Sequence, residues 1–132
     1  MLRTISLLWL LLLLVALPEG FAQRVYDASG RSIGRVSNDR YYDGHGRFIG
    51  RTDNGRAYDS AGRFIGRLEN DRLYDGSGRY IGRTGNGRLY DRTGRYTGRI
   101  DGGRVYDRTG RLLYRTEGMN QQQIVLFFYF YR

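Results

Sequence analysis

Apolar and polar residues alternate in short runs between residues 24 and 119, and the runs recur with a period of sixteen. One unit, residues 72–87, reads RLYDGSGRYIGRTGNG. The six units begin at Arg24, Arg40, Arg56, Arg72, Arg88 and Arg104 and align without a gap. The runs have the two-residue period of β-strands, and this region has no helical period. A strict period of this kind predicts one supersecondary unit repeated in space.

Two turn signals divide each unit. The first has the form Asp-x-x-Gly, as in Asp75 to Gly78, where aspartate can cap its own turn and glycine supplies a positive φ. The second is a two-residue signal such as Asn86-Gly87, which suits a tight primed turn. Each unit is therefore predicted to be a β-hairpin that another hairpin turn joins to the next. The predicted fold class is all-β, a closed up-and-down antiparallel β-barrel of about six repeated hairpins.

The register within a unit depends on its central glycine. Strict alternation places Leu73 and Ile81 on one face but brings Arg83 to that face as well. A β-bulge at Gly82 would shift the register by one, sending Arg83 outward and Thr84 inward. The predicted inward set is aliphatic and includes Val25, Ile33, Val36, Leu73, Ile81, Leu89 and Ile100.

Each unit also carries an outward tyrosine. These are Tyr26, Tyr42, Tyr58, Tyr74, Tyr90 and Tyr106. A ring of aromatics can bind sugar, but arginine stacked on tyrosine is a simpler interpretation and contributes about 0.5–1 kcal/mol per exposed pair. Packing is the favoured interpretation.

The composition changes after the last unit, where the chain ends in NQQQIVLFFYFYR. An exposed run of this kind would promote aggregation, so the tail, residues 120–132, is expected to pack with the barrel of residues 23–119. About twelve strands enclose more space than their own side chains fill, and a helix is about 10 to 12 Å across. The tail can therefore form a central plug helix. The β-branched and aromatic residues from Ile124 to Tyr131 favour an extra strand instead, so both alternatives stay open.

The first 22 residues have the form of a secretory signal peptide. Arg3 precedes an apolar run from Ile5 to Leu17, and the small residues Gly20 and Ala22 are spaced as a cleavage site. The run is shorter than the roughly 20 apolar residues of a membrane-spanning helix. We therefore expect export, cleavage after Ala22 and no transmembrane helix afterwards. The chain has no cysteine, so the protein is not expected to be a lipoprotein.

The net charge is +9, and every basic residue is arginine. The charge favours an anionic partner, but most arginines lie beside aspartate and tyrosine and are expected to have structural roles. Arg92 and Arg108 lie at predicted turn tips, outside the arginine positions shared by all units. They are the candidate anion-binding residues. Phosphate, lipid or glycan of the envelope is the expected ligand class, and nucleic acid is a less natural partner for an exported protein.

The sequence offers little for catalysis. The single histidine, His45, lies at a turn tip, and no zinc site or catalytic triad can be assembled from these residues. The repeated aspartates are better explained as turn caps than as paired catalytic carboxylates. A small outer-membrane barrel is disfavoured, because its strands need about 9 to 11 residues and an apolar lipid face. We therefore expect a protein without enzymatic activity and without a cofactor.

The repeats resemble the β-flower proteins, particularly the five-fold β-flower family of exported bacterial proteins with units like YDxxGRxIGRxxxG. The resemblance covers the signal peptide, the units from Arg24 to Met119 and the closing YRTEGMNQQQIVLFFYFYR. It implies a shallow, pseudo-symmetric barrel in which each hairpin is a petal, and it carries no established activity. This chain departs from the pattern in having six units, and in having Tyr114 where other units have glycine. The tyrosine suggests that the chain leaves the ring at that residue.

Two functions remain open from the sequence. The first is a non-catalytic structural or interaction module of the cell envelope, located in the periplasm, at the cell surface or outside the cell. The alternative is a barrel that binds an anionic ligand, lipid or glycan, or another envelope protein.

Overall fold

The computed structural model describes residues 23–132. The predicted signal peptide, residues 1–22, and its cleavage site lie outside the described residues.

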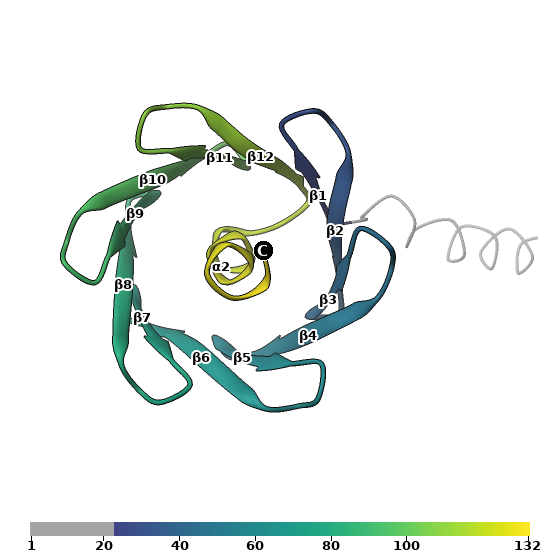
Figure 1. Ribbon diagram of the computed structural model, residues 1–132, viewed down its shortest axis with the longest axis horizontal. Helices are drawn as coiled ribbons and strands as arrows, with labels where there is room; N and C mark the ends of the chain where they lie inside the picture. Colours follow the sequence, from purple (N-terminus) through teal and green to yellow (C-terminus); the bar gives the residue numbers. More distant parts are fainter. Residues whose placement is uncertain (1–22) are drawn as a thin grey trace, which may run out of the picture.

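Twelve antiparallel strands form a closed barrel in which each strand pairs with its neighbours in sequence and β1 pairs with β12 (Figure 1). The strands are β1 (Gln23–Asp27), β2 (Ser32–Ser37), β3 (Arg40–Asp43), β4 (Phe48–Asp53), β5 (Arg56–Asp59), β6 (Phe64–Glu69), β7 (Arg72–Asp75), β8 (Tyr80–Gly85), β9 (Arg88–Asp91), β10 (Tyr96–Asp101), β11 (Arg104–Asp107) and β12 (Leu112–Glu117). The predicted all-β barrel of six hairpins is confirmed. Figure 1 shows the hairpins projecting around the centre as six petals.

Both predicted turns form as the sequence indicates. At the outer tips, for example, Gly62 has a φ of 84° and donates to the Asp59 carbonyl at 3.0 Å. The Asp59 carboxylate accepts from the amides of Ala61 and Arg63, each at 2.9 Å, and so caps its own turn. At the inner turns both central residues have positive φ, as at Asn86 (53°) and Gly87 (77°).

The register shift is present, but it lies one residue before the predicted position. Tyr80 pairs with Tyr74 and Gly82 pairs with Leu73, so Ile81 is the extra residue. Arg83 is exposed and Thr84 is buried, as the shift requires. The inward residue is therefore Gly82 itself, while Ile81 is only half-buried against the core.

The C-terminal segment is the central helix, and the alternative of an extra strand is wrong. It consists of an α-helix, α2 (Gln121–Leu126), and a π-helix, η2 (Phe127–Tyr131), which lie inside the ring (Figure 1). Asn120 starts α2 with a capping box: its side chain accepts from the Gln123 amide at 2.8 Å, and the Gln123 side chain accepts from the Asn120 amide at 3.0 Å. Burial of the apolar run inside the barrel overrides its strand propensity.

One glycine in each of β2, β4, β6 and β8 forms a socket for an aromatic side chain of η2. An added Cβ at Gly34 would lie 3.2 Å from the Phe127 ring, and one at Gly82 would lie 3.2 Å from the Tyr129 hydroxyl. Cβ atoms at Gly66 and Gly50 would likewise meet Phe130 and Tyr131. At all four of these glycines, and at Gly98, the added Cβ would also meet a backbone carbonyl oxygen of the next strand. Glycine is therefore required at this position by the close approach of the neighbouring strand, and at four of the five positions by an aromatic ring as well.

Tyr114 remains within β12, so the expectation that the chain leaves the ring there is wrong. Its buried ring contacts Phe127 edge-on at a centroid distance of 5.8 Å and lies 6.3 Å from Phe128. Tyr114 thus supplies from the wall an aromatic ring at a position where the other petals have a socket. The chain leaves the ring only after Glu117.

The π-helical geometry spreads five consecutive aromatic side chains around the barrel axis. An α-helix completes a turn in about 3.6 residues, so five consecutive residues run past a full turn. The i→i+5 bonding of η2 widens the turn, and residues 127 to 131 then point in different radial directions. This explains how successive residues reach sockets on different petals.

The socket geometry predicts that alanine destabilises the protein at one glycine of β8 and has little effect at another. Gly82→Ala is expected to lower the free energy of unfolding by about 1–3 kcal/mol, because its Cβ meets the Tyr90 carbonyl oxygen and Tyr129. Gly85→Ala is the matched control, since its Cβ meets open space, and should change stability by about 0.5 kcal/mol or less. Urea unfolding measures both, and equal effects of the two substitutions would contradict the socket assignment.

Candidate functional site

The outer wall of the barrel carries a ring of six arginine–tyrosine stacks, which confirms the predicted stacking of arginine on the repeated tyrosines. The stacked pairs are Arg35–Tyr42, Arg51–Tyr58, Arg67–Tyr74, Arg83–Tyr90, Arg99–Tyr106 and Arg115–Tyr26, with guanidinium-to-centroid distances from 3.9 to 4.3 Å. The last pair joins β12 to β1 and so lies across the closure of the ring. Each stack bridges two neighbouring petals.

A second aromatic ring extends four of these stacks. In the fourth unit and its neighbour, Arg83 lies opposite Tyr90, and Tyr90 lies opposite Tyr96. The two tyrosine rings meet edge-on at 6.0 Å, and Tyr96 is 36% exposed. Tyr42–Phe48, Tyr58–Phe64 and Tyr74–Tyr80 have the same arrangement. Rows of arginine and aromatic side chains therefore run across the outer wall.

Arginines also face arginines within every hairpin. The directly opposite pairs are Arg24–Arg35, Arg40–Arg51, Arg56–Arg67, Arg72–Arg83, Arg88–Arg99 and Arg104–Arg115. Like charges opposite each other in a sheet are destabilising unless opposite charges lie nearby. The outer wall thus concentrates positive charge and favours the approach of anions.

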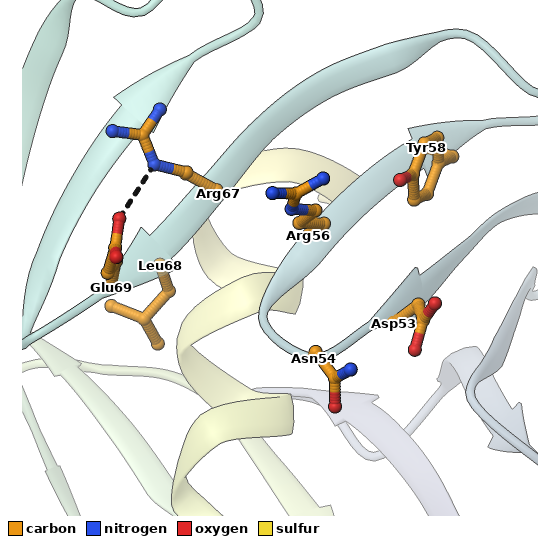
Figure 2. A pocket seen from close by; sticks show the side chains of 7 residues that line it. All are labelled: Asp53, Asn54, Arg56, Tyr58, Arg67, Leu68 and Glu69. Carbon is orange, nitrogen blue, oxygen red and sulfur yellow. Dashed lines mark hydrogen bonds and ion pairs between the residues drawn. The ribbon is translucent and has the colours of Figure 1, made fainter.

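Carboxylates at the inner ends of the even-numbered strands offset part of this charge. Arg67 pairs with Glu69 at 3.1 Å, Arg99 with Asp101 at 3.3 Å, and Arg115 with Glu117 at 3.0 Å. Figure 2 shows the Arg67–Glu69 pair, with Arg56 on the neighbouring strand. Because these side chains are solvent-exposed, each pair contributes little to stability, roughly 0–1 kcal/mol.

Several hollows adjoin these rows, and two of them have contrasting linings. The groove of Figure 2, about 330 Å³, lies on the outer wall and is lined by Asp53, Asn54, Arg56, Tyr58, Arg67, Leu68 and Glu69. A second hollow of about 540 Å³ lies beside the first turn of α2, where Gln121 and Gln122 face the inner turns of two petals. Charged and aromatic groups line the first hollow, and amide groups line much of the second.

The carboxylates at the petal tips have structural roles. In Asp59, amide hydrogen bonds from Arg63 and Ala61, together with the Arg63 guanidinium, lower the pKa of the carboxyl. In Asp91 and Asp107, hydroxyl donation from Thr93 and Thr109 is the largest cause of the lowered pKa. These aspartates are held ionised as turn caps, as the sequence predicted.

Buried tyrosines surround η2. Burial raises the pKa of Tyr41 and of Tyr129 to about 12. It also raises the pKa of Tyr131, whose hydroxyl lies 2.8 Å from the Arg51 carbonyl and 2.9 Å from that of Tyr58. Tyr41 stacks on Tyr131 at 4.5 Å, but its hydroxyl has no hydrogen-bond partner among residues 23–132.

Arg92 and Arg108 lie exposed in the outer turns between β9 and β10 and between β11 and β12, at the tips of consecutive petals. Within residues 23–132 neither belongs to an ion pair, and neither lines the two hollows. His45 is exposed at another tip, where its amide donates to Asp43. The described part of the chain contains no cluster of three potential metal ligands and no helix long and apolar enough to span a membrane.

Sequence reasoning missed the opposed arginine pairs. Every unit has an arginine at its first and twelfth positions, but these two arginines face each other only because the register shifts at Ile81. The sequence predicted the extra residue at Gly82 and so did not pair the two arginines.

The family described as 5-fold beta-flower protein matches residues 22–132. No curated protein and no solved structure matches the chain.

The buried tyrosines predict a loss of stability at alkaline pH. Because the folded-state pKa of Tyr41 is about 12 and the ordinary value is 10.0, its contribution is complete below pH 10 and is lost as the pH rises toward 12. Tyr41→Phe is expected to preserve or raise stability at pH 7, since it removes an unpaired buried hydroxyl, and to make the alkaline loss shallower.

Tyr131→Phe is the matched control, because it removes a hydroxyl that donates to backbone carbonyls, and should cost about 0.5–1.5 kcal/mol at pH 7. Urea midpoints at pH 7 and pH 11 test both variants. A Tyr41→Phe protein that is less stable than Tyr131→Phe at pH 7 would be inconsistent with this assignment.

Proposed function

This chain belongs to the 5-fold beta-flower proteins, and we propose that it is an exported, non-catalytic interaction module of the cell envelope that binds anionic partners through its outer wall. The observation that carries the proposal is the set of opposed arginine pairs on that wall. Each pair leaves positive charge that an anionic group can offset.

The filled centre supports the outer wall as the binding surface. Ile124, Val125 and Phe127 are at most 2% exposed, so the chain's own helix occupies the space where a barrel of this size would otherwise hold a ligand. The repeated arginines remain within reach of solvent: the Arg67, Arg99 and Arg115 side chains are 32%, 42% and 39% exposed even where they pair with acids.

Export is proposed from the sequence of residues 1–22, and the fold is compatible with it. Closure of the ring by β1 and β12 and the filled centre stabilise a chain that has no cysteine for disulfides. The net charge of +9 suits the anionic polymers and headgroups of an envelope.

We expect the purified protein to be retained on dextran sulfate but not on neutral dextran, and to elute as the salt concentration rises. Replacing Arg72 and Arg88 by glutamine should lower the eluting salt concentration more than Arg92→Ala/Arg108→Ala, because only the first pair faces further arginines on the wall. A stronger effect of the Arg92 and Arg108 substitutions would move the binding surface to the petal tips. No retention at low salt would leave a purely structural module.

A further inference from the structure

One position in each petal lies between two arginines on the outer wall. It is the last residue of each even-numbered strand: Ser37, Asp53, Glu69, Gly85, Asp101 and Glu117. Each lies two residues after a stacked arginine on the same strand and directly opposite the first arginine of the next strand. Four of the six are acidic, so a carboxylate usually occupies this place.

In the fourth petal this position is occupied by Gly85, which has no side chain to place between the two arginines. It lies directly opposite Arg88 and two residues after Arg83, and both arginines are exposed. A Cβ at Gly85 would meet nothing within 4 Å, so neither packing nor close approach requires glycine here. Its neighbour Gly82, in contrast, has no room for a side chain.

The surroundings of Gly85 add positive charge. Arg72 lies opposite Arg83, and Arg99 lies opposite Arg88, so two like-charged pairs flank the gap. Of the acidic residues nearby, Asp101 pairs with Arg99 at 3.3 Å. Asp71 lines the same hollow as Gly85, but among residues 23–132 it forms no ion pair with Arg83 or Arg88.

Glu69 is opposite Arg72 in the register but pairs with Arg67 at 3.1 Å. Among residues 23–132 no ion pair includes Arg83 or Arg88. In three other petals the arginine equivalent to Arg83 pairs with the acid two residues later.

Ser37 is the other neutral position, but it differs in one respect. Its inner turn contains Asp39, next to Arg40, so a carboxylate lies close to that gap. The turn after Gly85 is Asn86-Gly87 and carries no charge. Gly85 therefore differs from Ser37 in having no charged residue in the turn that follows it.

We propose that Arg83 and Arg88 form an anion-binding site at Gly85 that takes a carboxylate of an acidic polysaccharide. This inference rests on the proposed function and specifies its site and ligand. A carboxylate fits because four other petals have an acidic residue at this position, and three of these acids pair with the arginine two residues earlier. At Gly85 two guanidinium groups can hold a carboxylate by forked hydrogen bonds.

The aromatic row beside the site favours a polysaccharide as the carrier of that carboxylate. The Arg83 guanidinium lies over the Tyr90 ring at 3.9 Å, the shortest of the six stacks, and Tyr96 follows in the same row. An exposed ring with an apolar face and a polar hydroxyl suits the C–H face and hydroxyls of a sugar. A uronic acid bound at Gly85 would have its neighbouring sugars near Tyr90 and Tyr96.

The direct test is titration of the purified protein with a short oligogalacturonate at low ionic strength, measured by calorimetry. Gly85→Asp supplies the missing carboxylate from the protein itself and should weaken binding about tenfold or more, because it competes for charge-assisted hydrogen bonds. Gly85→Asn is the matched control, since it adds the same volume without charge and should retain most of the affinity.

A second variant tests whether removing a carboxylate from the equivalent position in another petal creates a binding site. Asp53→Gly empties the equivalent place between Arg51 and Arg56 and should add a second binding site to the titration. Urea midpoints close to that of the unsubstituted protein show that all three variants fold.

The possible outcomes distinguish failure of the Gly85 site from failure of the proposed anion-binding function. Oligogalacturonate binding that Gly85→Asp leaves unchanged overturns the site but not the proposed function. Binding to vesicles of anionic phospholipid or to inorganic phosphate, without binding to oligogalacturonate, overturns the choice of a polysaccharide. If a neutral maltooligosaccharide binds as tightly as the oligogalacturonate, recognition of a carboxylate is overturned. No binding to any of the anionic probes overturns both the site and the proposed function.

Discussion

The close contact between the inward glycines of the barrel and the aromatic side chains of η2 determines much of the structure. A ring of twelve strands needs a filler, and the filler here is a helix whose rings reach the backbone of the wall. The glycine at the centre of each petal is therefore a packing residue. The sixth petal achieves the same packing differently, because Tyr114 extends from the wall toward Phe127 and Phe128.

The filled centre leaves the outer wall available for binding. The register shift that turns Gly82 inward also turns Arg83 outward, and the repeat places that arginine against both Tyr90 and Arg72. Stacking on tyrosine in every petal, and pairing with a carboxylate in three of them, offset the repulsion between opposed arginines. Where a petal lacks its carboxylate, as at Gly85, the same architecture leaves an uncompensated pair of guanidinium groups. Stability and binding thus depend on the same repeated register.

The sequence was sufficient to predict the local structure, because turn chemistry and a sixteen-residue period are local signals. Asp-x-x-Gly and Asn-Gly specify the two turns, and the repeat then implies an up-and-down barrel. Long-range packing was harder to predict. The helical state of the tail depends on burial inside the barrel, and the role of Tyr114 depends on contact with residues 13 and 14 positions later. The opposed arginines were missed because an error of one residue in a bulge changes which side chains face each other. Arg92 and Arg108 were recognisable as exposed tips, and their proposed role in anion binding stays a prediction.

Hydrogen exchange of a protein that ends at Met119 tests most directly whether the C-terminal helix holds the barrel together. Without residues 120–132 the glycine sockets lose the aromatic side chains that fill them, so we expect loss of slow amide exchange in the strands and loss of a cooperative urea transition. Gln121→Ala/Gln122→Ala in the full chain, which alters only exposed residues of α2, should preserve both. A truncated protein with the exchange protection and urea midpoint of the full chain would contradict the account.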